Sequence, residues 1–248
     1  DMRLRRNLQD PRRFQQKYSA MVDALPFGTY ARAYRGQPMY GLRRPNHTQW
    51  IRERIGLDQF TLTDAIEAGA TPNVPFFRAS MMEGDPNAEE NERQKGVSAH
   101  GGVRGVTLGW HFNFSYWDTE SDVAAIGMKA LGAGANIFQM LVYGERNWRE
   151  VTALTPEENP LDYMQGRTKM HPSSEIGELT VAYAGVPGLI FGGVYEELED
   201  PFQESERRSL MLDVHPWPYW QIELWRRYES GTRALADTLG VLHIYFDW

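Results

Sequence analysis

The stretch GWHFNFSYWDTESD, Gly109 to Asp122, restricts the fold more than any other part of the sequence. Because successive side chains of a β-strand point to opposite faces, its period of two predicts a half-buried strand. We expect the aromatic face to pack in the core and the opposite face to meet a partner, a ligand or a covering helix. The aromatic face contains Trp110, Phe112, Phe114 and Tyr116, and the opposite face contains His111, Asn113, Ser115 and Trp117.

The residues around this strand predict an α+β fold. Thr119 and Asp122 have the spacing of a capping box, although Asp replaces the usual Glu or Gln, so we expect a helix over residues 119–131. Residues 177–198 read as two strands around a Pro–Gly turn, and residues 222–239 read as a further helix. This order predicts a mixed or antiparallel sheet covered by helices, and a ferredoxin-like arrangement is one topology compatible with it.

Residues 1–96 differ in character from residues 97–248. Pro and Gly recur among short apolar runs, and we expect helices over residues 11–25 and 46–56 with irregular chain between them. Such a segment buries little of its own surface, so it needs another molecule to order it. We therefore divide the chain into a long irregular, partly helical N-terminal arm, residues 1–96, and an α+β domain, residues 97–248.

The arm is basic, whereas the chain as a whole has a net charge of −7. Residues 1–54 contain twelve Lys or Arg and four Asp or Glu. We expect such an arm to contact other protein subunits or anionic lipid headgroups. Nucleic acid ranks lower as a partner, because the rest of the chain is acidic. The expected contact residues are Arg3, Arg5, Arg6, Arg12, Arg13, Arg43, Arg44 and Trp50.

Motifs of catalysis and cofactor binding are missing from the sequence. There is no cysteine, which excludes thiol chemistry, Cys-ligated zinc and iron–sulfur clusters. No phosphate-binding loop, no nucleophile elbow and no HExxH zinc motif occurs. The six histidines could bind a metal only by converging from distant elements, which a sequence does not show. We therefore expect no catalytic residue, no cofactor and no metal.

Two apolar stretches approach the length of a membrane-spanning helix, which needs about 20 mostly apolar residues. Residues 123–143 are interrupted by Lys129, Asn136 and Gln139, and residues 179–195 contain a Pro–Gly turn. We interpret both as elements of a protein core rather than as spans.

A Trp-rich loop, HPWPYW at residues 215–220, precedes the last predicted helix. Trp217 and Trp220 could anchor a partner or a ligand, because Trp is enriched at interface hot spots. The alternative is that they pack against the start of that helix as a hydrophobic staple.

These features favour a non-catalytic accessory or scaffold subunit of a large multi-protein assembly. The start at Asp1 rather than Met, the Arg-rich beginning and the absence of cysteine are compatible with mitochondrial import. We therefore expect an energy-converting complex of the mitochondrial inner membrane, with the arm near anionic lipid. Two alternatives stay open: a small-molecule-binding protein or enzyme with a pocket lined by His111, Asn113 and Ser115, and a virion structural protein.

Overall fold

Thirteen β-strands form one antiparallel sheet in which each strand pairs with its neighbours in the sequence. The computed structural model describes residues 18–37, 39–41, 55–57, 61–72, 74–86, 88–105, 109–153, 173–200, 203–231 and 234–244. The strands are β1 (Tyr18–Leu25), β2 (Thr29–Gly36), β3 (Thr63–Ala70), β4 (Pro75–Met82), β5 (Lys95–Arg104), β6 (His111–Glu120), β7 (Ala124–Ile137), β8 (Met140–Ala153), β9 (Ser173–Val186), β10 (Leu189–Asp200), β11 (Gln203–Val214), β12 (Trp220–Ser230) and β13 (Leu235–Ile244). Two short 3-10 turns, η2 (Pro26–Gly28) and η3 (Glu90–Glu92), complete the described regular structure.

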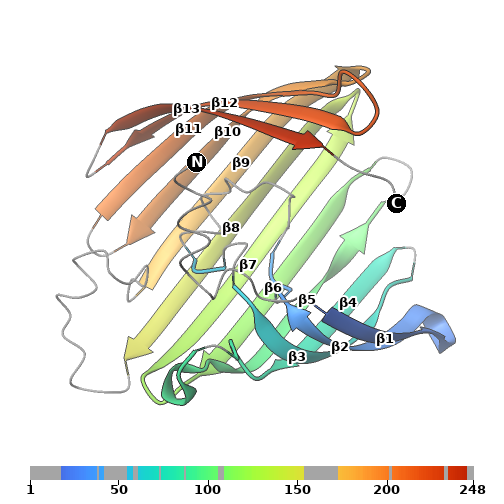
Figure 1. Ribbon diagram of the computed structural model, residues 1–248, viewed down its shortest axis with the longest axis vertical. Coiled ribbons are helices and arrows are strands. Elements are labelled where there is room, and N and C mark those ends of the chain that lie inside the picture. Colours follow the sequence, from blue (N-terminus) through green and yellow to red (C-terminus); the bar gives the residue numbers. More distant parts are fainter. Residues whose placement is uncertain are drawn as a thin grey trace.

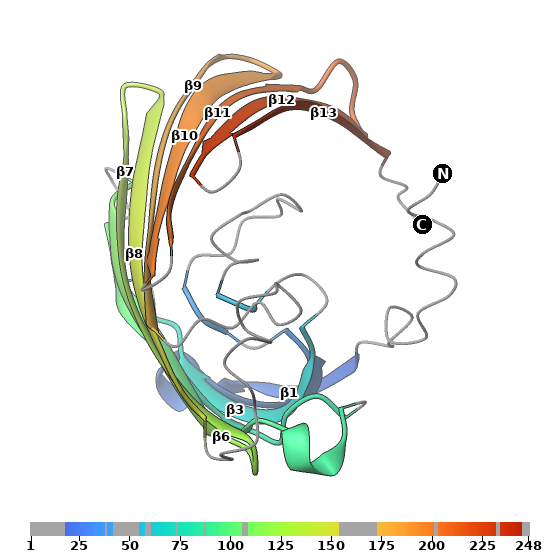
Figure 2. The same ribbon diagram turned by 90° about the vertical axis from the view of Figure 1, so that its left-hand side faces the viewer.

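The sheet is strongly curved. Figure 1 shows long, tilted strands lying side by side, and Figure 2 shows the sheet bending around a hollow. β1 and β13 are the edge strands of the described sheet and do not pair with each other. A tilted antiparallel sheet that bends back on itself has the geometry of a barrel wall.

The two ends of the strands differ in their connections. At one end, which we call the short-turn end, the chain reverses within residues 26–28, 71–74, 105–110, 138–139, 187–188 and 215–219. The opposite end, which we call the long-loop end, carries the three longest connections, over residues 37–62, 83–94 and 154–172. It also carries three short ones, over residues 121–123, 201–202 and 231–234.

The tight turn between β7 and β8 is one that the sequence does not predict. Phe138 and Gln139 both have positive φ, 48° and 68°. Two-residue type I′ hairpins require this backbone conformation and usually obtain it from Asn-Gly or Asp-Gly. Because neither residue has that preference, the sequence carries no turn signal here.

The α+β prediction is wrong, because the described residues form strands and contain no α-helix. The helix predicted over residues 119–131 is the end of β6 followed by β7, and the one over residues 222–239 is the β12–β13 hairpin. Ile222, Trp225 and Tyr228 have helical spacing, yet they alternate between the two faces of β12. Trp225 is the large apolar residue on the otherwise polar face of this strand, and together with Ile222 and Tyr228 it imitates helical spacing.

The N-terminal region is also not an irregular extension. β1 to β4 lie within residues 1–96 and belong to the same sheet as the later strands. The helix expected over residues 11–25 is β1 in its described part, and most of residues 46–56 lies outside the described residues. The sheet continues through β5 across residue 96, and the division into two domains stays a prediction.

The two apolar stretches take part in hairpins of the sheet. Residues 123–143 contain β7 and the start of β8, and residues 179–195 contain the end of β9, its turn and the start of β10. Within the described ranges, no helix is both long enough and apolar enough to cross a membrane.

Two contacts identify the concave face of the sheet. Tyr40 and Gly41 belong to the β2–β3 connection, whose described part lies inside the curve of the sheet (Figure 2). The Gly41 amide donates a hydrogen bond of 2.7 Å to Ser115 Oγ, and the Tyr40 ring packs edge-on against Trp117 at 6.3 Å. The face of β6 that carries Ser115 and Trp117 is therefore concave, and the face that carries Phe112 and Phe114 is convex.

The sequence prediction had these two faces reversed. Phe112 and Phe114 are 47% and 39% exposed on the convex side, whereas Asn113 is 2% exposed on the concave side. Large aromatic side chains on an outer face cost free energy in water, so this outer face needs an apolar environment.

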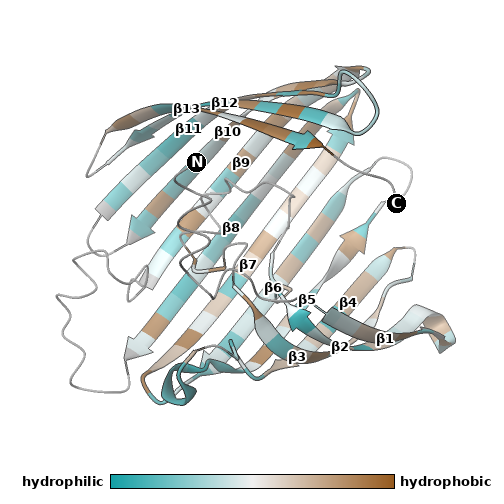
Figure 3. Ribbon diagram, viewed as in Figure 1, coloured by the Kyte–Doolittle hydropathy of each residue, from teal (hydrophilic) through white to brown (hydrophobic). Residues whose placement is uncertain are grey.

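Apolar residues on the convex face gather toward the short-turn end. Figure 3 shows hydrophobic and hydrophilic residues alternating along the strands. On β6 the convex positions run from Phe112 and Phe114 to Asp118 and Glu120, and β9 to β11 follow the same gradient. The exposed apolar residues of this face include Val22, Ile66, Phe77, Met81, Leu131, Val142, Leu179, Val181, Phe191, Leu210, Leu224 and Leu242.

A charge placed within the apolar part of this face should destabilise the fold. Leu131 and Ala125 share the convex face of β7, but Ala125 lies toward the charged end. We expect Leu131→Arg to lower the free energy of unfolding in lipid vesicles by about 2–4 kcal/mol and Ala125→Arg by no more than about 1 kcal/mol. Urea titration measures both, and equal losses would contradict an apolar band that ends between the two positions.

Candidate functional site: the polar concave face

The concave face is lined by buried polar and charged side chains. Such groups are stable only when other polar groups satisfy them, so their arrangement is specific. They come from strands throughout the sheet and include both signs of charge. The set includes Glu67, His100, Asn113, Ser115, Glu145, Asn147, Arg149, Glu178, Thr180, Glu196 and Arg207.

Glu67 on β3 is a buried carboxylate with three side-chain partners. It accepts hydrogen bonds from the Tyr30 hydroxyl at 2.6 Å, from Arg32 at 3.1 Å and from the Ser80 hydroxyl at 3.2 Å. The Tyr30 ring lies over Gly69, where a Cβ atom would come within 2.6 Å of it. Glycine at this position therefore allows Tyr30 to lie flat and reach Glu67.

A row of three glutamates crosses β8 to β10. Glu145, Glu178 and Glu196 are directly paired across neighbouring strands, and Arg207 on β11 continues the row. Like charges placed opposite each other destabilise a sheet unless other groups compensate them. Glu145 accepts hydrogen bonds from the Tyr143 hydroxyl at 2.7 Å and from Asn147 at 2.9 Å, and Arg207 donates to Glu196 at 2.6 Å.

His111 and Tyr143 stack across an intervening strand. Gly134 on β7 is paired with both residues, and their rings lie 5.6 Å apart at an interplanar angle of 21°. A Cβ atom on Gly134 would lie 2.5 Å from His111 Cε1. Glycine at residue 134 is therefore required for the two rings to meet above β7.

The structure brings four of the predicted site residues together on one face. His111, Asn113, Ser115 and Trp117 all lie on the concave side of β6. Ser115 Oγ also lies 2.8 Å from His100 Nδ1 on β5. A role for these residues in binding a partner or a ligand stays a prediction.

Trp217 and Trp220 lie apart from that group, at the short-turn end between β11 and β12. Their rings meet edge-on at 6.0 Å, and both side chains are exposed. The predicted contact residues of the arm lie outside the described residues, and their contact with protein subunits or anionic lipid stays a prediction. These are Arg3, Arg5, Arg6, Arg12, Arg13, Arg43, Arg44 and Trp50.

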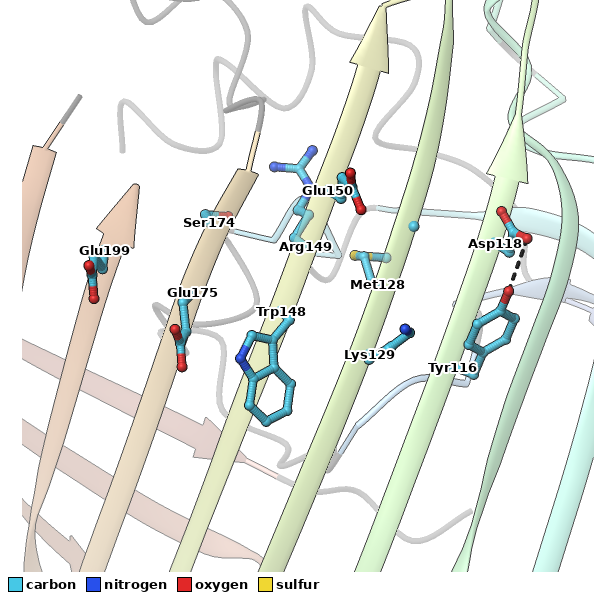
Figure 4. A pocket seen from close by; sticks show the side chains of 11 residues that line it. Tyr116, Asp118, Met128, Lys129, Trp148, Arg149, Glu150, Ser174, Glu175 and Glu199 are labelled. Atoms are coloured by element: carbon cyan, nitrogen blue, oxygen red, sulfur yellow. Dashed lines mark hydrogen bonds between the residues drawn. The ribbon is translucent and has the colours of Figure 1, made fainter. Parts of the chain in front are cut away.

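A shallow pocket of about 610 Å³ lies where the apolar band of the convex face ends, on the side of the long-loop end. Lys129 is paired there with Tyr116 on one side and Trp148 on the other, and Glu175 and Asp118 lie nearby (Figure 4). The Tyr116 hydroxyl donates a hydrogen bond of 3.0 Å to Asp118. Aromatic rings beside charged groups are typical of the level where an apolar environment meets water.

Sequence reasoning missed most of the concave face. The signal was a polar residue at every second position, as in Tyr143, Glu145, Asn147 and Arg149 along β8. That alternation is weak in each strand and becomes informative only when it recurs across many strands.

No protein-family model matches the chain, and no curated protein matches it by sequence. Solved structures do match its fold. The outer-membrane protein OmpT of Vibrio cholerae aligns with a TM-score of 0.64 at 12% identity, over 92% of this chain and 80% of that chain. A loop-deletion mutant of OmpT aligns with a TM-score of 0.63 at 14% identity, over 86% and 74%.

A porin structure gives a third match, with a TM-score of 0.60 at 12% identity over 88% of this chain and 81% of that chain. The chain therefore has the fold of outer-membrane β-barrel proteins. This finding overturns the interpretation as an accessory subunit of a mitochondrial inner-membrane complex, together with the expected mitochondrial location. The likeness concerns the fold, and it does not test the two alternatives of a pocket-bearing enzyme or binding protein and a virion protein.

The ion pairs between β2 and β3 allow a test of which face of the sheet is the buried, concave one. Glu67 is buried beside Arg32, whereas Asp64 and Arg35 form a half-exposed pair on the convex side of the same strands. We expect Glu67→Ala to lower the free energy of unfolding by about 3 kcal/mol, because it leaves Arg32 without its buried partner. Asp64→Ala should cost less than about 1 kcal/mol. Urea titration of both variants gives the difference, and a larger loss for Asp64→Ala would reverse the assignment of faces.

Substitution of Gly134 should separate His111 from Tyr143. We expect Gly134→Ala to lower the free energy of unfolding by about 1–3 kcal/mol, because the added methyl group displaces the His111 ring. Gly127 on the same strand has open space around its Cβ position, so Gly127→Ala is the matched control and should be neutral or stabilising. Thermal unfolding of both variants measures this, and an unchanged Gly134→Ala variant would contradict the stacking.

Proposed function

We propose that the chain forms an outer-membrane β-barrel that provides a water-filled passage for small polar solutes. The observation that carries this proposal is the different character of the two faces. The large exposed apolar residues of the sheet lie mainly on the convex face, whereas the concave face carries buried polar and charged side chains beside an apolar cluster that includes Ile126, Met128 and Ile176. Barrels that span outer membranes alternate apolar residues toward lipid with polar residues toward the lumen.

The convex face fits contact with lipid. Trp110, directly before β6, and Tyr116 on β6 lie on either side of the apolar convex positions Phe112 and Phe114. Transmembrane barrels have such girdles of aromatic residues at both membrane interfaces. Each strand of the described sheet is hydrogen-bonded to its neighbours. This agrees with a membrane interior, where no water is available to backbone groups.

The connections support an orientation in that membrane. Outer-membrane barrels have short periplasmic turns and longer extracellular loops. By this rule the short-turn end of the sheet faces the periplasm, and the long-loop end, with its charged convex positions, faces the cell exterior.

The concave face fits a hydrated passage. It carries carboxylate, guanidinium, amide and hydroxyl groups from β3 to β11, chemical groups of the kind that hydrogen-bond polar solutes and water. The described part of the β2–β3 connection occupies some of the hollow, because Tyr40 and Gly41 contact the concave side of β6. Solutes would therefore pass between this segment and the opposite part of the wall.

Two neighbouring residues of β8 offer a direct test. Leu141 and Val142 are 41% and 37% exposed but lie on opposite faces, Leu141 on the concave side and Val142 on the convex side. Because the chain has no cysteine, Leu141→Cys and Val142→Cys each introduce one unique thiol. We expect purified protein in planar bilayers to conduct ions, and a charged, membrane-impermeant thiol reagent to reduce the current of Leu141→Cys.

Val142→Cys is the matched control and should keep its current, because lipid shields its thiol. Refolded protein that gives no conductance, with native-like migration on gels, would refute the passage. Equal modification of the two thiols would refute the assignment of the concave face as the lumen.

A further inference from the structure

Two pockets lie end to end on the convex face of β7 to β10. The polar pocket is the one of about 610 Å³ where the apolar band ends, and the apolar pocket, of about 350 Å³, lies next to it within the band. On each of the four strands, a convex residue of the polar pocket and a convex residue of the apolar pocket are two positions apart. These pairs are Lys129 and Leu131 on β7, Trp148 and Arg146 on β8, Glu175 and Gly177 on β9, and Glu199 and Glu197 on β10.

The apolar pocket exists because small residues interrupt a band of large ones. Ala133 on β7 is paired with Gly144 on β8, and both line the pocket. A Cβ atom on Gly144 would have its nearest neighbour at 3.5 Å, so the sheet itself leaves room for a side chain there. A hollow without partner atoms forfeits dispersion contacts, which an apolar chain seated in it restores. The larger residues around it are Phe112, Leu131, Leu179 and Tyr195.

The polar pocket places one lysine among several carboxylates. Lys129 is exposed between Tyr116 and Trp148 (Figure 4). No hydrogen bond or ion pair joins its ammonium group to another residue in the described ranges. The carboxylates that line this pocket are those of Asp118, Glu150, Glu175 and Glu199.

Arg146 stands at the border between the two pockets and is already paired. Its guanidinium contacts the carboxylates of Glu175 and Glu197, one from each pocket. Lys129 is therefore the cation of the polar pocket that is available to an anionic group, and the pocket as a whole has an excess of negative charge.

This charge pattern selects a zwitterionic headgroup. A phosphate group suits Lys129, whereas an additional net negative charge would be repelled by the four carboxylates. An ammonium group suits the carboxylates, and a primary ammonium offers them three hydrogen-bond donors that a quaternary ammonium lacks. Tyr116 and Trp148 agree with this level, because such rings are enriched where lipid headgroups meet hydrocarbon.

We propose that the two pockets together bind one phospholipid with a phosphoethanolamine headgroup. The phosphate contacts Lys129, the ammonium contacts the surrounding carboxylates, and one acyl chain lies over Gly144 in the apolar pocket. This inference rests on the part of the proposed function that puts the convex face in a membrane, and it does not depend on the passage.

Native mass spectrometry of the folded chain, released from detergent micelles, tests the headgroup. Palmitoyl-oleoyl phosphatidylethanolamine, phosphatidylcholine and phosphatidylglycerol are added in separate titrations. We expect the first phosphatidylethanolamine to bind at least roughly fivefold more tightly than either of the other two lipids. Equal binding of the three lipids would overturn the inference.

The contact with phosphate is tested by Lys129→Met. We expect this variant to bind phosphatidylethanolamine roughly fivefold more weakly, as the loss of one partly exposed ion pair predicts. Arg226→Met is the matched control, because Arg226 is a convex cation of β12 that lines neither pocket and bonds Thr238. It should bind the lipid as wild type does.

The seat of the acyl chain is tested by Gly144→Leu, which fills the apolar pocket. We expect it to weaken binding of phosphatidylethanolamine by at least roughly fivefold. Gly193→Leu is the matched control: Gly193 lies on the convex face of β10, lines neither pocket, and has the same 3.5 Å to the nearest atom from its Cβ position. Far-ultraviolet circular dichroism confirms that each variant is folded.

The inference is overturned if folded Lys129→Met or Gly144→Leu binds phosphatidylethanolamine as tightly as wild type, or if the control variants lose it to the same extent. Conductance in planar bilayers tests the passage separately. A conducting wild-type chain without lipid preference would refute this site alone, and a selective but non-conducting chain would refute the passage alone.

Discussion

The register between consecutive strands is the constraint on which the rest of this structure depends. A shift of one residue in any pair would move every side chain of a strand to the other face. Here it would bring Phe112 and Phe114 inward and expose Asn113 and Ser115 to the outside. The two faces are so different in polarity that only one register is compatible with an apolar outer environment.

The same register explains how a concave face can hold so many buried charges. Partners of each carboxylate come from the same face, either two residues along the same strand or directly across the sheet. Glu145 is bound by Tyr143 and Asn147 on its own strand, whereas Glu196 is bound by Arg207 across the pair of β10 and β11. Because these donors are set by the strand geometry, little additional ordering is needed to satisfy the charges.

Part of this fold was predictable from the sequence. The strand around residues 110–117 is confirmed as β6, and the Pro–Gly hairpin is confirmed as β9 and β10. The helix predictions were wrong because they assumed that each apolar residue lies in the core of a protein surrounded by water. In this sheet many large apolar residues face outward, while others such as Ile126 and Trp225 face inward, so that neither face looks uniformly polar in the sequence.

The candidate sites were less predictable for a different reason. Glu145, Glu178 and Glu196 are each unremarkable in their own segments, and no motif joins them. They meet because Glu145 pairs with Glu178 across β8 and β9, and Glu178 pairs with Glu196 across β9 and β10. A row of side chains assembled from three strands depends on register rather than on spacing along the chain. Its recognition therefore requires the paired sheet, and the polar residue at every second position is the only local trace that it leaves in the sequence.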